Sequence, residues 1–233
     1  MIGIGRRSAC LLLLAAGCAS RPPLGPHGLP EKIFDLPSGS CTARPSAAEA
    51  GEKMTRLTAA IGHYPPTYKD EADRESIYAE WSALLLCAEA LPAGRHAEDR
   101  FALLAELYRQ GHNLDVRGAG ERAASNLQEC LVEFPDSVTC NLTASYFYLS
   151  VEPTPEHIAI AERSLTVLRE QALPGYSDDA EAGFVFLFLY RRDEEGARAQ
   201  IARYLELFPN GARAGDFRKM RDHLGGGIRV REW

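Results

Sequence analysis

The sequence predicts an all-α protein, an antiparallel array of helix pairs that follows a proline-rich N-terminal segment. From about residue 46 onward, apolar residues recur at helical spacing, and no run of strict alternation is bounded by hairpin turns. Start signals precede several of the expected helices. The breaks between helices are nearly periodic, because Pro135, Pro174 and Pro209 are separated by 39 and 35 residues. A period of this length with two helices per unit is typical of helical repeat arrays.

The first 17 residues have the three parts of a secretory signal peptide. A basic pair, Arg6 and Arg7, precedes an apolar run at residues 9–16, which ends in small residues just before Cys18. The run is much too short to span a bilayer, since a spanning helix needs roughly 20 apolar residues. We therefore expect residues 1–17 to be removed from the mature protein.

The end of this segment, Leu14-Ala15-Ala16-Gly17-Cys18, resembles the lipobox of bacterial lipoproteins. The resemblance implies that Cys18 is diacylated, that the peptide is cut just before it, and that the new amino terminus is acylated. One acyl chain binds a membrane marginally, whereas two or more anchor a protein stably. Ala19 is not acidic, which by the sorting rule of these lipoproteins favours the outer membrane, facing the periplasm, over the inner membrane. An ordinary cleavage site beside a chance cysteine is the alternative.

Net charge argues against nucleic acid as a partner. The whole chain has a formal net charge of −6, and removing residues 1–17, which contain two arginines and no acids, makes it more negative. Nucleic-acid binding asks for a basic patch or stripe, and none is evident. Attachment to the membrane therefore depends on the lipid at Cys18, and we expect no other cofactor.

Residues 18–45 are rich in Pro, Gly and Ser and have few periodic apolar residues. Such a segment buries too little surface to offset its ordering entropy, so it is expected to be a tether. The exception is "EKIFDL", residues 31–36, whose Ile33, Phe34 and Leu36 are expected to dock on the domain or on a partner.

The helices of the domain, residues 46–224, carry local start signals. Thr154 is expected to cap a helix that Pro155 opens. Asp178 and Glu181 have the spacing of a capping box, and Asp193 is expected to cap the helix that follows. We assign these carboxylates to capping rather than to catalysis. The expected helices are residues 46–62, 71–90, 97–110, 120–134, 139–150, 155–171, 178–191, 194–208 and 212–224.

The last helix pair, residues 180–211, resembles a tetratricopeptide repeat. This sequence departs from the motif at three positions. Glu181 stands where the motif favours tryptophan, Val185 where it has glycine, and Tyr204 where it has a small residue. The resemblance implies a tetratricopeptide-like α-solenoid, with another antiparallel helix array as the alternative. The residues that match the motif are Phe184, Phe188, Ala197, Ile201 and Pro209.

Earlier units match less well. The unit at residues 97–135 fits only if part of "GHNLDVRGAG", residues 111–120, is an insertion between its helices. The unit at residues 140–174 keeps its apolar periodicity and its proline. The residues of the first of these units that fit are Tyr108, Ala123, Leu127 and Pro135.

Four cysteines remain in the mature chain besides Cys18, and in an exported protein they are disulfide candidates with three possible pairings. Cys130 lies near the end of one expected helix and Cys140 near the start of the next, which favours a bridge between them. Cys41 with Cys87 would then join the end of the tether to the second helix. Buried free thiols are the alternative, and no spacing typical of a zinc site accompanies the cysteines.

Catalytic motifs are absent from the sequence, and we expect a protein that is not an enzyme. It contains no HExxH, GxSxG, P-loop or GxGxxG before a helix, and its six histidines stand apart from one another. No metal site is expected.

Aromatic residues gather in two of the first helices of the expected pairs, at residues 146–149 and 184–190. Too many apolar residues are consecutive for one buried stripe, so these helices are either core all round or present some rings to a ligand. If a groove exists, it would capture a helix or an extended peptide. The candidate residues are Tyr146, Tyr148, Phe186 and Tyr190, with Arg191 and Arg192 at the rim.

These features predict an outer-membrane-anchored, non-enzymatic scaffold that binds another envelope protein. The combination of a lipobox with helical repeats resembles lipoproteins that assist the assembly of secretins, pili or barrel proteins. The competing hypothesis is an envelope enzyme or small-ligand-binding lipoprotein that uses the loop around residues 111–120. For the tail "GGGIRVREW", residues 225–233, a packed end and a flexible end are equally open.

Overall fold

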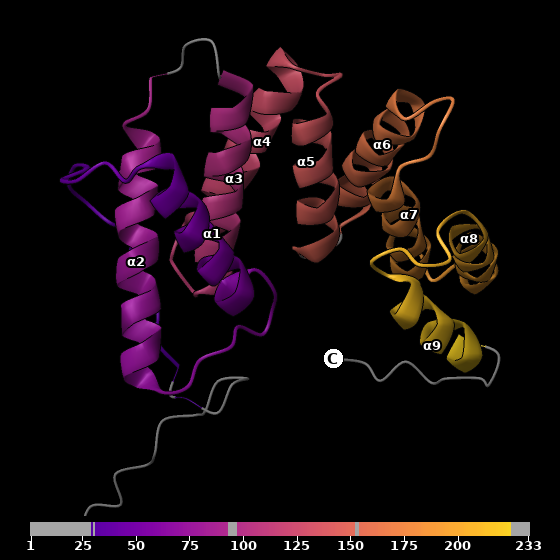
Figure 1. Cartoon of the computed structure of the whole chain (residues 1–233), viewed down its shortest axis with the longest axis horizontal. Helices are drawn as coiled ribbons and strands as arrows, with labels where there is room; N and C mark the ends of the chain where they lie inside the picture. Colours follow the sequence, from indigo (N-terminus) through magenta and orange to yellow (C-terminus); the bar gives the residue numbers. More distant parts are fainter. Residues whose placement is uncertain (1–28, 30, 93–96, 152–153, 225–233) are drawn as a thin grey trace, which may run out of the picture.

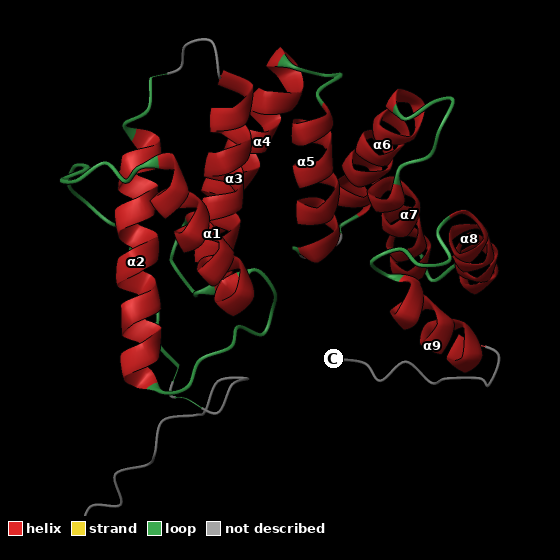
Figure 2. Cartoon of the chain, viewed as in Figure 1, coloured by secondary structure: helices red, strands yellow, loops and turns green. Residues whose placement is uncertain are grey.

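The computed structural model describes residues 29, 31–92, 97–151 and 154–224 (Figure 1). Within these residues the protein is all-α, with nine helices and no strand (Figure 2). The expected signal peptide, residues 1–17, the expected lipidation site Cys18 and the tail at residues 225–233 lie outside the described residues.

The helix bounds agree with the expected ones to within two residues, with one exception. Helix α3 extends three residues beyond residue 110, because its last residue, Asn113, is tied to α1 by a hydrogen bond of 2.9 Å from Asn113 Nδ2 to the Ile61 carbonyl. The helices are α1 Ala47–Ile61, α2 Glu71–Glu89, α3 Ala97–Asn113, α4 Ala119–Glu133, α5 Val138–Ser150, α6 Pro155–Gln171, α7 Asp178–Tyr190, α8 Glu194–Leu207 and α9 Ala214–Leu224.

Two of the expected caps are confirmed. The Thr154 side chain accepts a hydrogen bond of 3.2 Å from the His157 backbone N–H, and Pro155 is the first residue of α6. Asp193 accepts a hydrogen bond of 2.8 Å from the Gly196 N–H at the start of α8. Each cap satisfies a backbone donor that has no partner inside its helix.

The capping box expected at Asp178 and Glu181 is wrong. Ser177 caps α7 instead, because its backbone is extended there and its hydroxyl accepts a hydrogen bond from the Ala180 N–H. Asp178 is the first helical residue, and its carboxylate accepts a hydrogen bond of 2.6 Å from the Tyr204 hydroxyl of α8. Both carboxylates therefore take part in tertiary contacts rather than in capping.

The helices pack in consecutive pairs, α1/α2, α3/α4, α5/α6 and α7/α8 (Figure 1). Each odd-numbered helix from α1 to α5 also packs on the next odd-numbered helix, whereas the even-numbered helices contact only their neighbours in the chain. Helix α9 packs on α8 at the end of the array. Helices α1, α3, α5 and α7 consequently share one side of the molecule, which we call the odd-helix face.

Small residues recur at the buried contacts between these helices. Ala105, Ala144 and Gly183 lie 39 residues apart in α3, α5 and α7, and all three are buried. A Cβ atom added at Gly183 would lie 2.3 Å from Leu165 Cδ2, so any larger residue there would require the buried Leu165 side chain to move. Helices α4, α6 and α8 each bury a small and a large residue one turn apart, at Ala123 and Leu127, Ala161 and Leu165, and Ala197 and Ile201.

An arm formed by residues 31–45 lies along α2. Phe34 is buried and stacks on Tyr78 with ring centroids 4.1 Å apart. Its backbone N–H donates to the Asp115 carbonyl at 3.1 Å, and its carbonyl accepts from the Arg117 N–H at 2.9 Å. The expected docking on the domain is confirmed for Phe34 and Leu36, whereas Ile33 is 66% exposed and does not dock. The segment expected to be a tether, residues 18–45, therefore contains residues that contact the domain, namely Phe34, Leu36 and Cys41.

Both expected disulfides are present. Cys41 and Cys87 join the arm to α2 with a Cα–Cα distance of 4.5 Å, and Cys130 and Cys140 join α4 to α5 with a Cα–Cα distance of 5.8 Å. The four cysteines could pair in three ways, and the structure contains the one in which Cys130 and Cys140 link neighbouring helices across the turn at residues 134–137.

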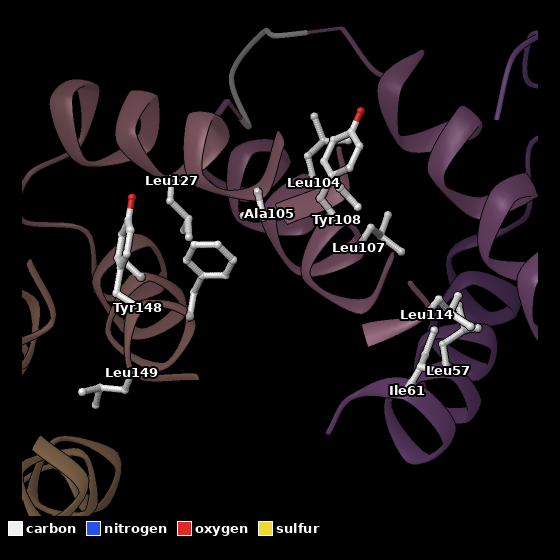
Figure 3. Close-up of a cluster of buried hydrophobic side chains, with 14 of the residues drawn as sticks. Leu57, Ile61, Leu104, Ala105, Leu107, Tyr108, Leu114, Leu127, Tyr148 and Leu149 are labelled. Carbon is white, nitrogen blue, oxygen red and sulfur yellow. The ribbon is translucent and has the colours of Figure 1, made fainter. Parts of the chain in front are cut away.

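The largest core cluster runs from the arm to α7 (Figure 3). At one end of it, Leu57 and Ile61 of α1 point toward Leu114, which follows α3 (Figure 3). A second cluster joins α7, α8 and α9, where the buried Phe217 ring lies 4.8 Å from the ring of Tyr204.

Glu181 is a buried charge at the centre of the contacts between α6, α7 and α8. Its carboxylate accepts hydrogen bonds from Arg203 Nε at 3.0 Å, Gln200 Nε2 at 2.6 Å and Arg169 Nη2 at 2.9 Å. Burial acts to raise the pKa of Glu181, but the hydrogen bonds from these three residues outweigh it and hold the pKa below its ordinary value. The carboxylate is therefore ionised at neutral pH.

We predict that Phe34→Ala lowers the free energy of unfolding by about 3 kcal/mol, because it removes a buried ring and leaves a cavity. Ile33→Ala is the matched control, since Ile33 is the adjacent residue and is 66% exposed. It should change stability by less than about 0.5 kcal/mol. Urea unfolding of both variants measures the difference, and equal effects would show that the arm does not contribute to the core.

Glu181→Gln should destabilise the protein at pH 7 by about 2 kcal/mol, because it removes charge-assisted hydrogen bonds to two arginines. Since the pKa of Glu181 is lower in the folded chain than in the unfolded chain, its ionisation stabilises the fold above the ordinary value of 4.5. That contribution is lost as the pH falls through the folded-state pKa. The variant should therefore lose less stability than the parent between about pH 5 and pH 3.

Urea unfolding at several pH values measures this slope, with Glu195→Gln as the control at an exposed carboxylate in α8. The control should change the acid slope much less than Glu181→Gln does. A Glu181→Gln variant with the parent's acid slope would contradict the assigned role.

Candidate partner-binding face

A stripe of accessible side chains runs along α5 on the odd-helix face. Leu142, Thr143 and Tyr146 are half-buried and Ser150 is exposed. Successive members of this set are one, three and four residues apart in the sequence, which places them on the same side of the helix. Because α5 packs on α3, α4, α6 and α7, this stripe is the part of the helix that its neighbours leave open.

An open hollow of about 360 Å³ lies between this stripe and α3. Its size is at the small end of ligand pockets, and it suits one large side chain of a partner better than a whole cofactor. It is lined by Gly62, Glu106, Arg109, Leu142, Thr143, Tyr146 and Ser150.

Arg109 forms a fixed wall of the hollow. Its Nε and Nη2 donate to the two oxygens of Glu106 at 2.7 and 2.6 Å, and its Nη1 donates to the Gly62 carbonyl at 2.9 Å. Gln110 Nε2 donates to Glu106 at 3.0 Å. A guanidinium held at three of its nitrogens keeps its planar face in one orientation, and that face can pack against an aromatic ring of a partner.

Tyr146 forms the aromatic wall. Its hydroxyl donates a hydrogen bond of 3.0 Å to the Asp179 carbonyl at the start of α7. Burial, with the nearby Asp179 carboxylate as a second cause, raises the pKa of Tyr146 well above its ordinary value. The phenol therefore stays protonated and contributes a ring surface rather than acid or base chemistry.

Two of the six candidate residues lie on this face, Tyr146 and Phe186. Phe186 is half-buried on α7, with the Arg213 guanidinium 5.8 Å from its ring centroid and the Phe217 ring 5.8 Å away. The charge of Arg213 also acts on Tyr146, where it opposes but does not outweigh the increase in the Tyr146 pKa that burial causes. Phe186 thus contacts Phe217 of α9 and does not line the hollow, whereas Tyr146 does.

Tyr148 is a core residue, and its candidate role in binding is wrong. It is 5% exposed and belongs to the same buried cluster as Leu127 (Figure 3). Its ring lies 5.1 Å from that of Phe147 and 5.0 Å from that of His157. It points away from the stripe because it follows Tyr146 by two residues, which turns it to another side of the helix.

The other three candidate residues lie at the far end of α7 from Asp179. Tyr190 is 44% exposed, and Arg192 begins the turn to α8 with a φ of 57°. Arg191 donates to Glu162 of α6 at 2.8 Å. The structure therefore does not bring these residues to the hollow beside Tyr146.

Sequence reasoning missed the polar residues that line the hollow. Glu106 and Arg109 are three residues apart, a spacing that also describes an ordinary solvent-exposed ion pair on a helix. A clearer signal was available in α5, where Leu142, Tyr146 and Ser150 recur every four residues beside the aromatic segment.

The loop that was considered as an enzymatic or small-ligand site is largely filled by the chain itself. Residues 111–113 complete α3, and Leu114 and Val116 are buried. The backbone around Val116 pairs with Phe34 of the arm, the one isolated bridge among the described residues. The segment at residues 111–120 thus binds the protein's own N-terminal arm.

Within the described ranges, no cluster of three or more His, Cys, Asp or Glu residues is placed to hold a metal ion. In the same part of the chain, no helix has both the length and the apolar composition needed to cross a membrane.

Comparison with known proteins gives no relative for this chain. No family model, no curated protein and no solved structure matches it.

Proposed function

We propose that this protein is a lipoprotein that Cys18 anchors to the outer membrane, facing the periplasm. In this proposal its helices form a tetratricopeptide-like, non-enzymatic scaffold that binds another envelope protein. The observation that carries the proposal is the open hollow between α3 and α5, lined by the fixed Arg109 and the ring of Tyr146.

The repeat interpretation is supported by two features of the packing. Odd-numbered helices pack on one another while even-numbered helices contact only their chain neighbours. Small buried residues recur 39 residues apart, at Ala105, Ala144 and Gly183. In a solenoid each unit covers the apolar face of the next, which requires such recurring close contacts. The departure at Glu181 is accommodated, since this carboxylate bonds to groups of α6 and α8.

Export from the cytoplasm is supported by the cysteines. Four of them form two disulfides, Cys41 with Cys87 and Cys130 with Cys140. Such bonds persist in oxidising compartments such as the periplasm and are rare in the cytosol. This agrees with the lipobox-like segment that ends at Cys18.

The hollow suits an aromatic or aliphatic side chain on a helical or extended segment of the partner. The ring of Tyr146 supplies apolar contact area, and Arg109 supplies a cation beside it. Tyrosine and arginine are the residue types that most often carry binding energy at protein interfaces. The partner in this proposal is a component of an envelope assembly, such as a secretin, a pilus or a barrel protein. An enzyme or small-ligand binder that uses residues 111–120 is less well supported, since Phe34 occupies that segment.

We predict that a photoreactive amino acid at Thr143 captures one specific envelope protein in living cells. In that background, Tyr146→Ser should lower the yield about tenfold or more, because loss of an aromatic anchor costs about 2 kcal/mol. Tyr146→Phe should retain most of the yield, since it keeps the ring.

A photoreactive group at Thr166 is the control, because Thr166 is exposed on α6, which is not part of the odd-helix face. Capture of the same protein from both positions with equal yield would refute binding at the hollow. Mass spectrometry of the crosslinked product identifies the partner.

Cys18→Ala should move the protein from the membrane fraction to the soluble periplasmic fraction and should abolish labelling by a palmitate analogue. Cys10→Ala is the matched control, because Cys10 lies in the same segment but outside the lipobox-like residues. It should leave both readouts unchanged. A Cys18→Ala protein that still sediments with membranes would exclude anchoring through this residue.

A further inference from the structure

A second surface gathers exposed apolar side chains at the ends of the helices. Seven large hydrophobic residues are exposed in the described part of the chain, and four of them lie in or next to the α4–α5 and α6–α7 turns. Single exposed apolar residues need no explanation, but a gathering of them marks an interaction surface. The four are Val132, Val138, Leu173 and Tyr176, with exposures of 75%, 52%, 65% and 53%. We call this surface the turn face.

The two turns lie side by side. Gln171 Nε2, at the end of α6, donates a hydrogen bond of 3.3 Å to the carbonyl of Asp136 in the α4–α5 turn. A shallow hollow of about 310 Å³ lies where they meet, and it is lined by Asp136, Val167, Glu170 and Gln171. Leu173, which is 65% exposed, follows the last of these lining residues by two positions in the sequence.

Charges of both signs flank these apolar residues. Asp136 and Glu170 are exposed at the hollow. On the other side, Arg203 is 45% exposed, and its guanidinium lies 5.5 Å from the centroid of the Tyr176 ring. The buried carboxylate of Glu181 holds Arg203 in place at 3.0 Å. The turn face therefore combines a projecting leucine, a hollow, an acidic edge and a fixed arginine.

A two-fold symmetric dimer needs a self-complementary surface, because each copy must present both halves of the interface. We propose that the turn face binds the turn face of a second copy of this chain. In this arrangement the exposed side chains of Leu173 and Tyr176 of each copy pack against those of the other, and Arg203 of each copy faces Asp136 and Glu170 of the other. The proposal does not depend on the lipid anchor or on the hollow between α3 and α5.

The interface is built from two turns and adjoining helix ends, which places it at the small end of specific protein interfaces. We therefore expect a reversible dimer rather than a permanent one. Its charged contacts lie at an exposed edge, where each pair contributes modestly and is screened by salt.

In-cell photocrosslinking of the full chain tests the proposal. Two copies of the chain with different epitope tags are expressed together. In one strain both copies carry a photoreactive amino acid at position 173, in place of Leu173, and in the control strain both carry it at position 64, in place of Tyr64. Tyr64 is the matched control, because it is 64% exposed compared with 65% for Leu173 and lies before α2. A product that carries both tags is expected from position 173 and not from position 64.

Charge reversal gives a second readout that does not depend on folding of the core. Glu170→Arg should lower the mixed-tag yield from position 173 about twofold to fivefold, by placing like charges opposite one another. Glu195→Arg, which makes the same change at an exposed position in α8, should leave the yield unchanged. Equal yields from positions 173 and 64, crosslinks from 173 only to other proteins, or indifference to Glu170→Arg would each overturn the proposal.

Discussion

Each helix pair in this protein leaves an apolar face that another element must cover, and the rest of the structure follows from this constraint. At the N-terminal end the arm provides the cover, since Phe34 and Leu36 pack against the core and Cys41 is joined to Cys87 of α2. At the C-terminal end α9 provides it, through the buried ring of Phe217. Between these ends the helices cover one another, and close contacts such as that of Gly183 with Leu165 set their spacing.

This constraint also decides which surfaces are open for binding. The arm fills the segment at residues 111–120, which a reading of the sequence alone had left as a possible ligand site. Helix α9 also places the ring of Phe217 against Phe186. What stays accessible on the odd-helix face is the middle of the array, where Arg109 and Tyr146 are held in place by backbone carbonyls. A rigid hollow of this kind lowers the entropic cost of binding, because its walls are already ordered.

Glu181 shows how a charge can replace a large apolar side chain at a contact between three helices. A buried carboxylate is costly unless hydrogen bonds satisfy it, and here Arg169, Gln200 and Arg203 do so. The two arginines remain partly exposed, with side-chain exposures of 35% and 45%. The same network that joins α6, α7 and α8 therefore also fixes cationic groups at the surface, next to the turn face.

The sequence by itself determined the features that depend on neighbours along the chain. Helix bounds, the caps at Thr154 and Asp193, and the pairing of Cys130 with Cys140 all follow from local periodicity, capping chemistry and short separations. The docking of "EKIFDL" through Phe34 and Leu36 was also predictable, because burial of apolar side chains from a proline-rich segment lowers the free energy of the folded chain. Only the tertiary structure decided which side chains are buried. Tyr146 and Tyr148 belong to one aromatic run, yet one lines a hollow and the other fills the core. Glu181 has the spacing of a capping residue, yet it bonds to two other helices. Burial of this kind depends on residues far apart in the chain, and local spacing does not carry that information.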